Sequence, residues 1–96
     1  MYTISVEDLL SLENPFIVDI RNIYYYNIDH IAGAINIPYY NLLNNYSHYL
    51  DKNNKYYFYC DFGEKSSELA KRLNKLGYNI ISVDGGYLEY KKIIRK

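Results

Sequence analysis

The sequence predicts an α/β domain built on a parallel sheet with helices on both faces. Four short apolar runs have the β-branched or aromatic character of buried strands, and stretches of helical pattern separate them. Strands that alternate with helices at this spacing form parallel sheets through right-handed crossovers. A length of 96 residues suits one domain and is too short for two ordinary ones. We therefore expect residues 1–96 to form a single domain.

The first helix is expected directly after Ser5, because Ser5 and Asp8 have the spacing of a capping box. An Asn-Pro pair at residues 14–15 would end this helix. Its apolar face is expected to consist of Leu9, Leu10 and Leu12.

The four expected strands are residues 16–20, 34–37, 56–59 and 79–83. The clearest helix is expected at residues 66–76, where leucines recur at i, i+4 and i+7 and Gly77 supplies a stop signal. Weaker patterns predict helices at residues 39–50 and 87–94 and a turn or two at residues 24–29.

Charge and composition narrow the function classes. The chain carries 11 Lys and Arg against 11 Asp and Glu and has no basic run that would grip a phosphate backbone, so no nucleic-acid partner is expected. The short basic segment at residues 91–96 suits a helix C-terminus. The single cysteine excludes an internal disulfide and a multi-cysteine metal cage. Without a signal-peptide pattern or a run of ~20 apolar residues, we expect a cytoplasmic protein with no membrane contact and a reduced thiol.

The chemistry is expected at Cys60, which follows the third predicted strand and precedes a loop and a helix. In open parallel sheets, ligands bind at the carboxyl ends of the strands. A loop that turns tightly into a helix directs backbone N–H groups inward, and the helix N-terminus adds partial positive charge, so both favour a thiolate. Gly63 would permit the positive φ of such a turn. Position alone also fits a small buried hydrophobe, the more common role of a free cysteine.

Four segments in order resemble the rhodanese homology domain, and the resemblance covers nearly the whole chain. They are Val18-Asp19-Ile20-Arg21, residues 30–38, residues 59–66, and Gly77-Tyr78 with Asp84-Gly85-Gly86-Tyr87. Residues 30–38 are similar to the family segment His-Ile-x-Gly-Ala-x-Asn-Ile-Pro, and residues 59–66 to its active loop, Tyr-Cys-x-x-Gly-x-Arg-Ser. The resemblance implies a small five-stranded parallel sheet flanked by helices on both faces, which agrees with the pattern of the sequence.

The resemblance also implies that Cys60 is the catalytic nucleophile of a sulfurtransferase. It would take a sulfane sulfur from a small donor such as thiosulfate or a persulfide, hold it as a cysteine persulfide, and pass it to a thiol or cyanide. A sulfur-relay protein is a further candidate partner, and neither a cofactor nor a metal is implied. The expected substrate-binding residues are Arg21, Asp61, Phe62, Gly63, Glu64, Lys65 and Ser66.

The active loop departs from the family pattern in its charge. Asp61 stands where Arg is frequent, and Lys65 replaces an Arg, so that a point charge replaces a bidentate fork. Asp61 and Glu64 outnumber Lys65, so the side chains of the loop carry a net negative charge. This charge disfavours both the ionised form of Cys60 and the binding of an anion. We therefore expect modest thiosulfate:cyanide activity and a preference for a neutral or protein-borne donor. Three further departures, expected to affect packing, are Tyr25, Asp29 and Tyr90.

Several residues have both a structural and a functional interpretation. Asp19 and Arg21 are expected to form a structural pair at a strand end, with Arg21 the better candidate for contact with an anion. His30 is expected to be a hydrogen-bonded structural residue rather than a general base. Ser66 and Ser67 are expected to cap the following helix, and Ser66 also to bond within the loop.

Exposed aromatic residues are the remaining candidates. Phe62, at the loop tip, is either a lip for substrates or a docking residue. The tyrosines at residues 24–26 are expected to pack in the core and at its rim rather than to form an exposed patch.

Other cysteine chemistries fit the sequence less well. A phosphatase or arsenate reductase of the related type needs Cys-x5-Arg, but Ser66 occupies the arginine position. A thiol–disulfide oxidoreductase needs a second cysteine where Gly63 stands. A catalytically weak rhodanese module used for protein interaction remains the alternative, because the loop is acidic.

Overall fold

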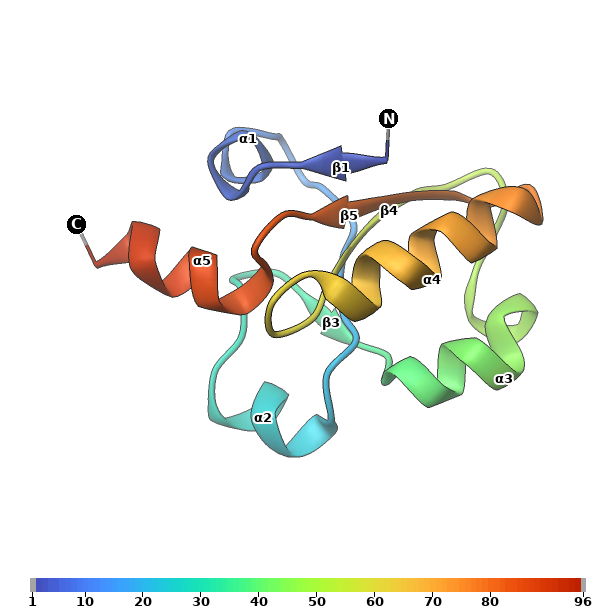
Figure 1. Ribbon diagram of the computed structural model, residues 1–96, viewed down its shortest axis with the longest axis horizontal. Helices are drawn as coiled ribbons and strands as arrows, with labels where there is room; N and C mark the ends of the chain where they lie inside the picture. The colour runs from blue at the N-terminus through green and yellow to red at the C-terminus, as the bar shows by residue number, and fades with distance from the viewer. Residues whose placement is uncertain (1, 96) are drawn as a thin grey trace.

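The computed structural model describes residues 2–95, which form five strands and five helices in chain order (Figure 1). The strands are β1 (Thr3–Ile4), β2 (Ile17–Asp19), β3 (Ile35–Asn36), β4 (Lys55–Tyr59) and β5 (Asn79–Val83). The helices are α1 (Val6–Leu10), α2 (Ile23–Ile28), α3 (Tyr39–Tyr49), α4 (Glu64–Lys75) and α5 (Gly86–Ile94).

The strands form one sheet in the order β1-β5-β4-β2-β3, and every neighbouring pair is parallel. This confirms the predicted α/β class. The central strands β2 and β4 end level with each other, because Asp19 pairs with Tyr59. Arg21 and Cys60, which follow these two residues, therefore leave the sheet at the same edge.

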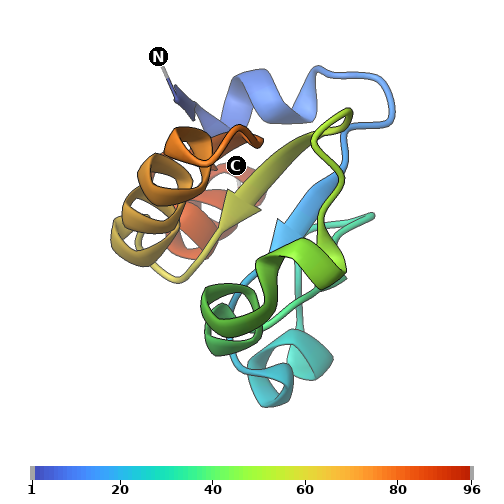
Figure 2. The same cartoon turned by 90° about the vertical axis from the view of Figure 1, so that its right-hand side faces the viewer.

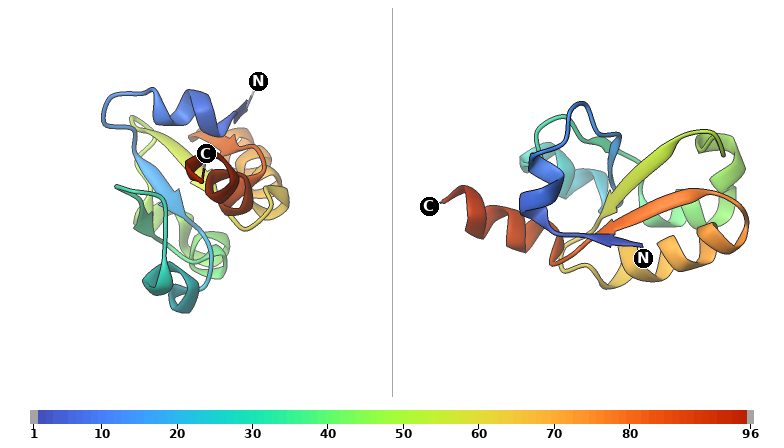
Figure 3. Two further views of the ribbon diagram at one scale, coloured as in Figure 1. Left: turned by 90° about the vertical axis from the view of Figure 1, so that its left-hand side faces the viewer. Right: turned by 90° about the horizontal axis from the view of Figure 1, so that it is seen from above.

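Helices cover both faces of the sheet, as predicted. Figures 2 and 3 show the helices around the sheet from the two sides. One core cluster lies under α3 and α4 and includes Leu42, Leu69, Phe58 and Ile80. The other lies under α1 and α5 and includes Leu9, Tyr59 and Tyr90. Successive side chains of β4 point to opposite faces of the sheet, so this strand contributes to both clusters. Tyr56 and Phe58 belong to one cluster, and Tyr57 and Tyr59 belong to the other.

The prediction for α1 was right about its start and about Leu9, and wrong about Leu10 and Leu12. The Asp8 N–H donates to Ser5 Oγ over 3.1 Å, as in the expected cap. The helix ends at Leu10, well before Pro15, and Leu10 and Leu12 are exposed. A helix this short presents about one turn to the sheet, and the buried positions are Val6 and Leu9.

Two strands, β1 and β3, differ from what the sequence pattern predicts. β1 was not expected from the pattern, because its two residues are too short for a period-2 signal. β3 is shorter than the predicted run at residues 34–37, since Ile35 and Asn36 alone pair with β2. The other strand predictions agree with the structure to within a residue or two.

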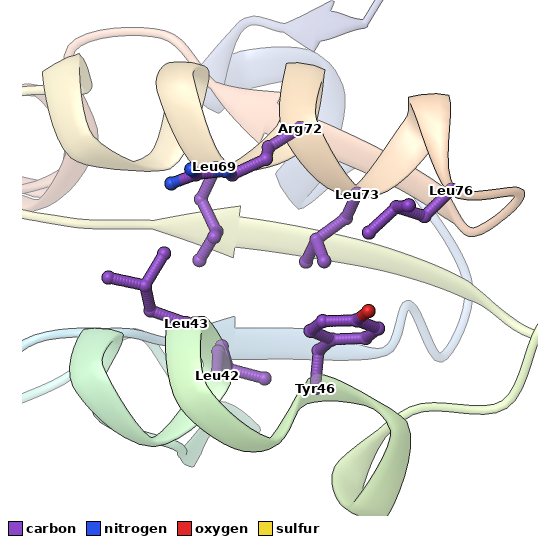
Figure 4. Close-up of a pocket in the computed structure, with 7 residues that line it drawn as sticks. All are labelled: Leu42, Leu43, Tyr46, Leu69, Arg72, Leu73 and Leu76. Atoms are coloured by element: carbon purple, nitrogen blue, oxygen red, sulfur yellow. The ribbon is translucent and has the colours of Figure 1, made fainter.

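Two hydrophobic features lie at the surface. A groove of about 360 Å³ runs between α3 and α4 (Figure 4). Its lining residues are Leu42, Leu43, Tyr46, Leu69, Arg72, Leu73 and Leu76. On α2, Tyr24 and Tyr25 are exposed, so the expectation that they pack in the core or rim was wrong for both. Only Tyr26 of this cluster packs, stacking on His30. Among residues 2–95, no helix is long and apolar enough to cross a membrane.

Candidate active site at the Cys60 loop

Cys60 directly follows β4 and is 6% exposed. Two backbone N–H groups point at its sulfur: Gly63 N–H donates to Sγ over 3.2 Å and Ser66 N–H over 3.4 Å. Because these donors belong to the loop and to the first turn of α4, the sulfur lies at the positive end of that helix. The arrangement is the anion-binding nest that the sequence predicts.

Gly63 is the residue that lets the loop close around the sulfur. Its φ is 103°, and a Cβ there would lie 3.2 Å from the Gly85 backbone nitrogen, so a side chain is disfavoured by conformation and by space. Gly63 is also the N-cap of α4, which begins at Glu64. The expectation that Ser66 and Ser67 cap this helix was therefore wrong, because both lie inside its first turn.

The N-terminus of α5 holds the loop from the other side. Tyr87 N–H donates to the Cys60 carbonyl over 2.9 Å and Leu88 N–H to the Asp61 carbonyl over 3.1 Å. Gly85 and Gly86 have positive φ, which allows the chain to turn from β5 into α5 this close to the loop. Two helix N-termini thus position Cys60, one at its sulfur and one at its carbonyl.

A pair of buried hydroxyls lies behind the sulfur. Ser66 Oγ is 3.6 Å from Cys60 Sγ, 3.2 Å from the Gly63 carbonyl and 2.8 Å from Ser82 Oγ. Both serines are at most 1% exposed. The sequence predicted that Ser66 forms hydrogen bonds within the loop, but it did not point to Ser82. A serine inside a strand gives no indication that its side chain contacts a loop that is distant in sequence.

Arg21 and Asp19 form a buried ion pair beside the loop. Arg21 Nη2 lies 2.7 Å from Asp19 Oδ2, and Arg21 Nε donates to both carboxylate oxygens over 3.1 Å. Burial disfavours the guanidinium charge, but the hydrogen bond and attraction of Asp19 raise the pKa of Arg21 above its ordinary value. The predicted structural pair is present.

Tyr59 extends this buried network into the core. Its hydroxyl donates to Asp19 Oδ2 over 2.5 Å and accepts from the Ile31 N–H over 3.0 Å. Burial and the hydrogen bond to Asp19 raise the pKa of Tyr59 far above the ordinary value for tyrosine. Tyr59 therefore remains a neutral donor and links β4, β2 and the segment that precedes β3.

The remaining surface of Arg21 is largely occupied by other groups. Its Nη2 also donates to the Asp29 carbonyl over 2.7 Å, and its guanidinium lies 4.2 Å from the centre of the Tyr87 ring. Nη1 faces the loop, where it is 3.9 Å from Asp61 Oδ1. Asp61 thus lies beside the guanidinium that was the better candidate of the pair for contact with an anion.

Two hollows open beside Cys60 and share Asp61 and Lys65. The smaller, of about 250 Å³, also includes Phe62 and Glu64. The larger, of about 320 Å³, reaches Arg21 and the tyrosines at the start of α3. The structure therefore brings together the predicted site residues: Gly63 and Ser66 contact the sulfur, and Arg21 and the other four line the adjoining hollows.

Of the other residues singled out in the sequence, Tyr25 lines the larger hollow, whereas His30 and Asp29 lie outside both hollows. His30 Nδ1 is within 2.8 Å of the Tyr26 carbonyl, a hydrogen-bonded arrangement. Asp29 is hydrogen-bonded to the Tyr87 hydroxyl and to Lys91 Nζ, and the pKa of Asp29 is lowered by these two bonds. Within residues 2–95, no group of three or more His, Cys, Asp or Glu side chains is placed to hold a metal ion.

The fold and the site define an α/β protein with a parallel sheet and a cysteine loop at the carboxyl edge of that sheet. The model of the rhodanese-like domain matches residues 4–93. The chain belongs to the rhodanese-like domain family.

Two relatives and one solved structure illustrate the family's range. The chain is 34% identical to the adenylyltransferase and sulfurtransferase uba4 of Ogataea parapolymorpha, with 95% of this chain and 24% of that protein covered. It is 29% identical to the tRNA uridine(34) hydroxylase of Buchnera aphidicola subsp. Baizongia pistaciae, with 94% of this chain and 31% of that protein covered. It thus spans only a quarter to a third of these curated relatives.

Among solved structures, a rhodanese-related protein from Thermoplasma volcanium superimposes with a TM-score of 0.84 at 28% identity. The comparison covers 96% of this chain and 93% of that one. This likeness confirms the expected fold.

Proposed function

We propose that this chain is a sulfurtransferase or sulfur carrier that holds a sulfane sulfur on Cys60 as a persulfide. The observation that carries the proposal is the nest: two backbone N–H groups at 3.2 and 3.4 Å stabilise negative charge at Sγ. Membership of a family that includes a protein named as a sulfurtransferase supports the same chemistry.

In the first step, the Cys60 thiolate attacks the outer sulfur of a donor. With thiosulfate, the new bond joins Sγ to that sulfur, the donor S–S bond breaks, and sulfite leaves with the electron pair. In the second step, cyanide or a thiolate attacks the terminal sulfur. The pair of the Sγ–S bond returns to Cys60, and thiocyanate or a new persulfide leaves, so no external oxidant or reductant is needed.

The geometry of the loop favours sulfur over phosphorus chemistry. A phosphatase loop of this kind clamps its phosphate with an arginine six residues after the cysteine, and that position holds the buried Ser66. Arg21, the buried arginine nearby, is bonded to Asp19. A singly charged persulfide needs less positive charge than a phosphate dianion, and backbone donors can supply it.

The donor and acceptor are proposed at the level of chemistry. A small sulfane donor and a thiol or cyanide acceptor suit the loop, and a sulfur-relay protein is a further partner, since the relative from Ogataea parapolymorpha combines adenylyltransferase and sulfurtransferase in its name. A lone thiol that must stay reduced fits a reducing compartment, for which we propose the cytoplasm.

Intact mass spectrometry tests the proposal. After incubation with thiosulfate or an organic sulfane donor, we expect the mass to rise by about one sulfur atom and to return on addition of cyanide. Cys60→Ser should remain unmodified. An unmodified wild type with every donor, or an equal adduct on Cys60→Ser, would contradict the proposal and leave the interaction module as the better account.

A further inference from the structure

The larger hollow beside Cys60 has walls unlike those of a site for a small inorganic dianion. Its volume of about 320 Å³ is within the range of small-molecule sites. Tyr25 of α2 and Tyr39 and Tyr40 of α3 line it together with Pro38. Tyr40 is 65% exposed, so the hollow is open on the side where its ring stands.

The charges around this hollow do not favour a dianion. Arg21 is bonded to Asp19, and its loop-facing nitrogen is 3.9 Å from Asp61. Lys65, the other cation in the lining, lies 5.2 Å from the centre of the Tyr39 ring and 5.9 Å from that of Tyr40. Each cation thus already has an acid or aromatic partner, and Asp61 would repel a second negative charge.

We propose that this hollow binds the organic part of the sulfur donor, so that the preferred donor is a singly charged organic persulfide or thiosulfonate with an aromatic or apolar body. The inference rests on the proposed function and assigns its substrate class. The donor's ring packs among Tyr25, Tyr39 and Tyr40, and its sulfane sulfur reaches Sγ at the base of the hollow. Rings packed this way gain from offset or edge contacts as well as from burial.

Sulfur transfer from an organic thiosulfonate to Cys60 balances in the same way as transfer from thiosulfate. With benzenethiosulfonate, the Cys60 thiolate attacks the terminal sulfur and the Sγ–S bond forms. The S–S bond of the donor breaks, and benzenesulfinate leaves with the electron pair. Two negative charges enter the step and two leave it, one on the persulfide and one on the sulfinate.

Three donors separate the effect of charge from that of the ring. Thiosulfate carries two negative charges, methanethiosulfonate carries one and has no ring, and benzenethiosulfonate carries one and has a ring. We expect kcat/KM for Cys60 loading to rise from the first to the second donor, and to rise at least about fivefold from the second to the third because of aromatic contacts.

Substitutions in the lining test whether the differences in kcat/KM between these donors arise from the hollow. Tyr40→Ala should reduce the benzene-to-methane ratio to about twofold or less, whereas Tyr2→Ala, which removes an exposed ring that is outside the lining, should leave it unchanged. Tyr25→Ala provides a second lining variant on another helix. Asp61→Asn should raise kcat/KM for thiosulfate relative to methanethiosulfonate, because it removes the repulsion of the second charge.

The outcomes distinguish the two proposals. If no donor loads Cys60, the proposed function fails and the inference with it. If thiosulfate loads Cys60 but the benzene-to-methane ratio is near one, or falls equally in Tyr2→Ala and Tyr40→Ala, the function stands and the organic-donor site is wrong.

Discussion

At the scale of single residues, the sulfur of Cys60 is surrounded by donors from the backbone, while the charged side chains stand further out. Gly63 and Ser66 supply N–H groups at hydrogen-bond distance, and Asp61 and Glu64 are exposed at the rim. Charges in contact with water are screened, whereas the two backbone N–H groups contact the sulfur directly. The proposed persulfide chemistry therefore depends on these backbone donors more than on the charged side chains of the loop.

The hydroxyls of Ser66 and Ser82 add a third donor when the sulfur is ionised. The Ser66 and Ser82 hydroxyl oxygens are 2.8 Å apart, and either can be the donor; in the arrangement that we propose, Ser82 donates to Ser66. Ser66 can then donate to the thiolate instead of to the Gly63 carbonyl. That carbonyl stays paired, because it also accepts from the Ser67 N–H over 3.0 Å.

We predict that Ser66→Ala slows the loading of Cys60 by thiosulfate roughly tenfold, because a hydrogen bond to the charged sulfur is lost. Ser82→Ala should slow loading less, since it acts through Ser66. Intact mass followed over time gives both rates. The double variant should match Ser66→Ala alone, and an additional loss in the double variant would show that Ser82 acts independently of Ser66.

At the scale of elements, Asp29 connects the end of α2 to α5, and hence to the helix that holds the active loop. Its carboxylate accepts from the Tyr87 hydroxyl and lies 3.0 Å from Lys91 Nζ. The hydrogen bond to Asp29 raises the pKa of Lys91, as expected for a charged pair. Asp29 is one of the departures from the family pattern, and its side chain makes both of these contacts.

We predict that Asp29 makes stability depend on pH. The bonds to Tyr87 and Lys91 lower the pKa of Asp29 in the folded state, so its contribution is complete above the unfolded value of ~3.9 and is lost as the pH falls through the folded value. The urea midpoint of wild type should exceed that of Asp29→Asn at pH 6, and the difference should shrink from about pH 5 downward. Glu13→Gln, in an exposed loop, is the control. A difference that is constant from pH 6 to pH 3 would contradict this account.

At the scale of the whole molecule, the two core clusters share the central strands. β4 supplies Phe58 to one cluster and Tyr59 to the other, and β2 supplies Val18 and Ile17 in the same way. The radius of gyration of 12.3 Å is close to the ~12–13 Å expected for a compact domain of this length. Loss of either cluster would therefore leave one face of the same strands uncovered.

We propose that the chain unfolds as one cooperative domain, and predict that far-UV circular dichroism and tyrosine fluorescence report the same urea transition. Ile80→Val and Ile31→Val, one on each face of the sheet and both fully buried, should each lower the free energy of unfolding by about 0.5–1.5 kcal/mol. Each substitution should shift both probes equally. Separate transitions for the two probes, or a shift seen by one probe alone, would show that the faces unfold independently.

Much of the fold could be predicted from the sequence, because the patterns that indicate its strands and helices involve residues close together in the chain. Apolar runs identified four strands, leucine spacing identified α4, and the order of motifs placed Cys60 at a strand end in a rhodanese-like fold. The errors came from contacts made at a distance. Leu10 and Tyr24 are apolar or aromatic and were expected inside, but α1 and α2 are short helices at the edge of the fold with little surface to pack against.

The sequence by itself determined the fold class, the position of Cys60 at a strand end and the loop that surrounds it, because strand periodicity, Gly63 and the spacing to α4 act over a few residues. Only the tertiary structure placed Ser82 behind Ser66, tied Tyr59 to Asp19 forty residues away, and set Asp61 against Arg21. It alone assembled the tyrosines of α2 and α3 into one hollow beside Cys60. These contacts join segments distant in the chain, so they follow from how the strands and helices pack rather than from any local pattern.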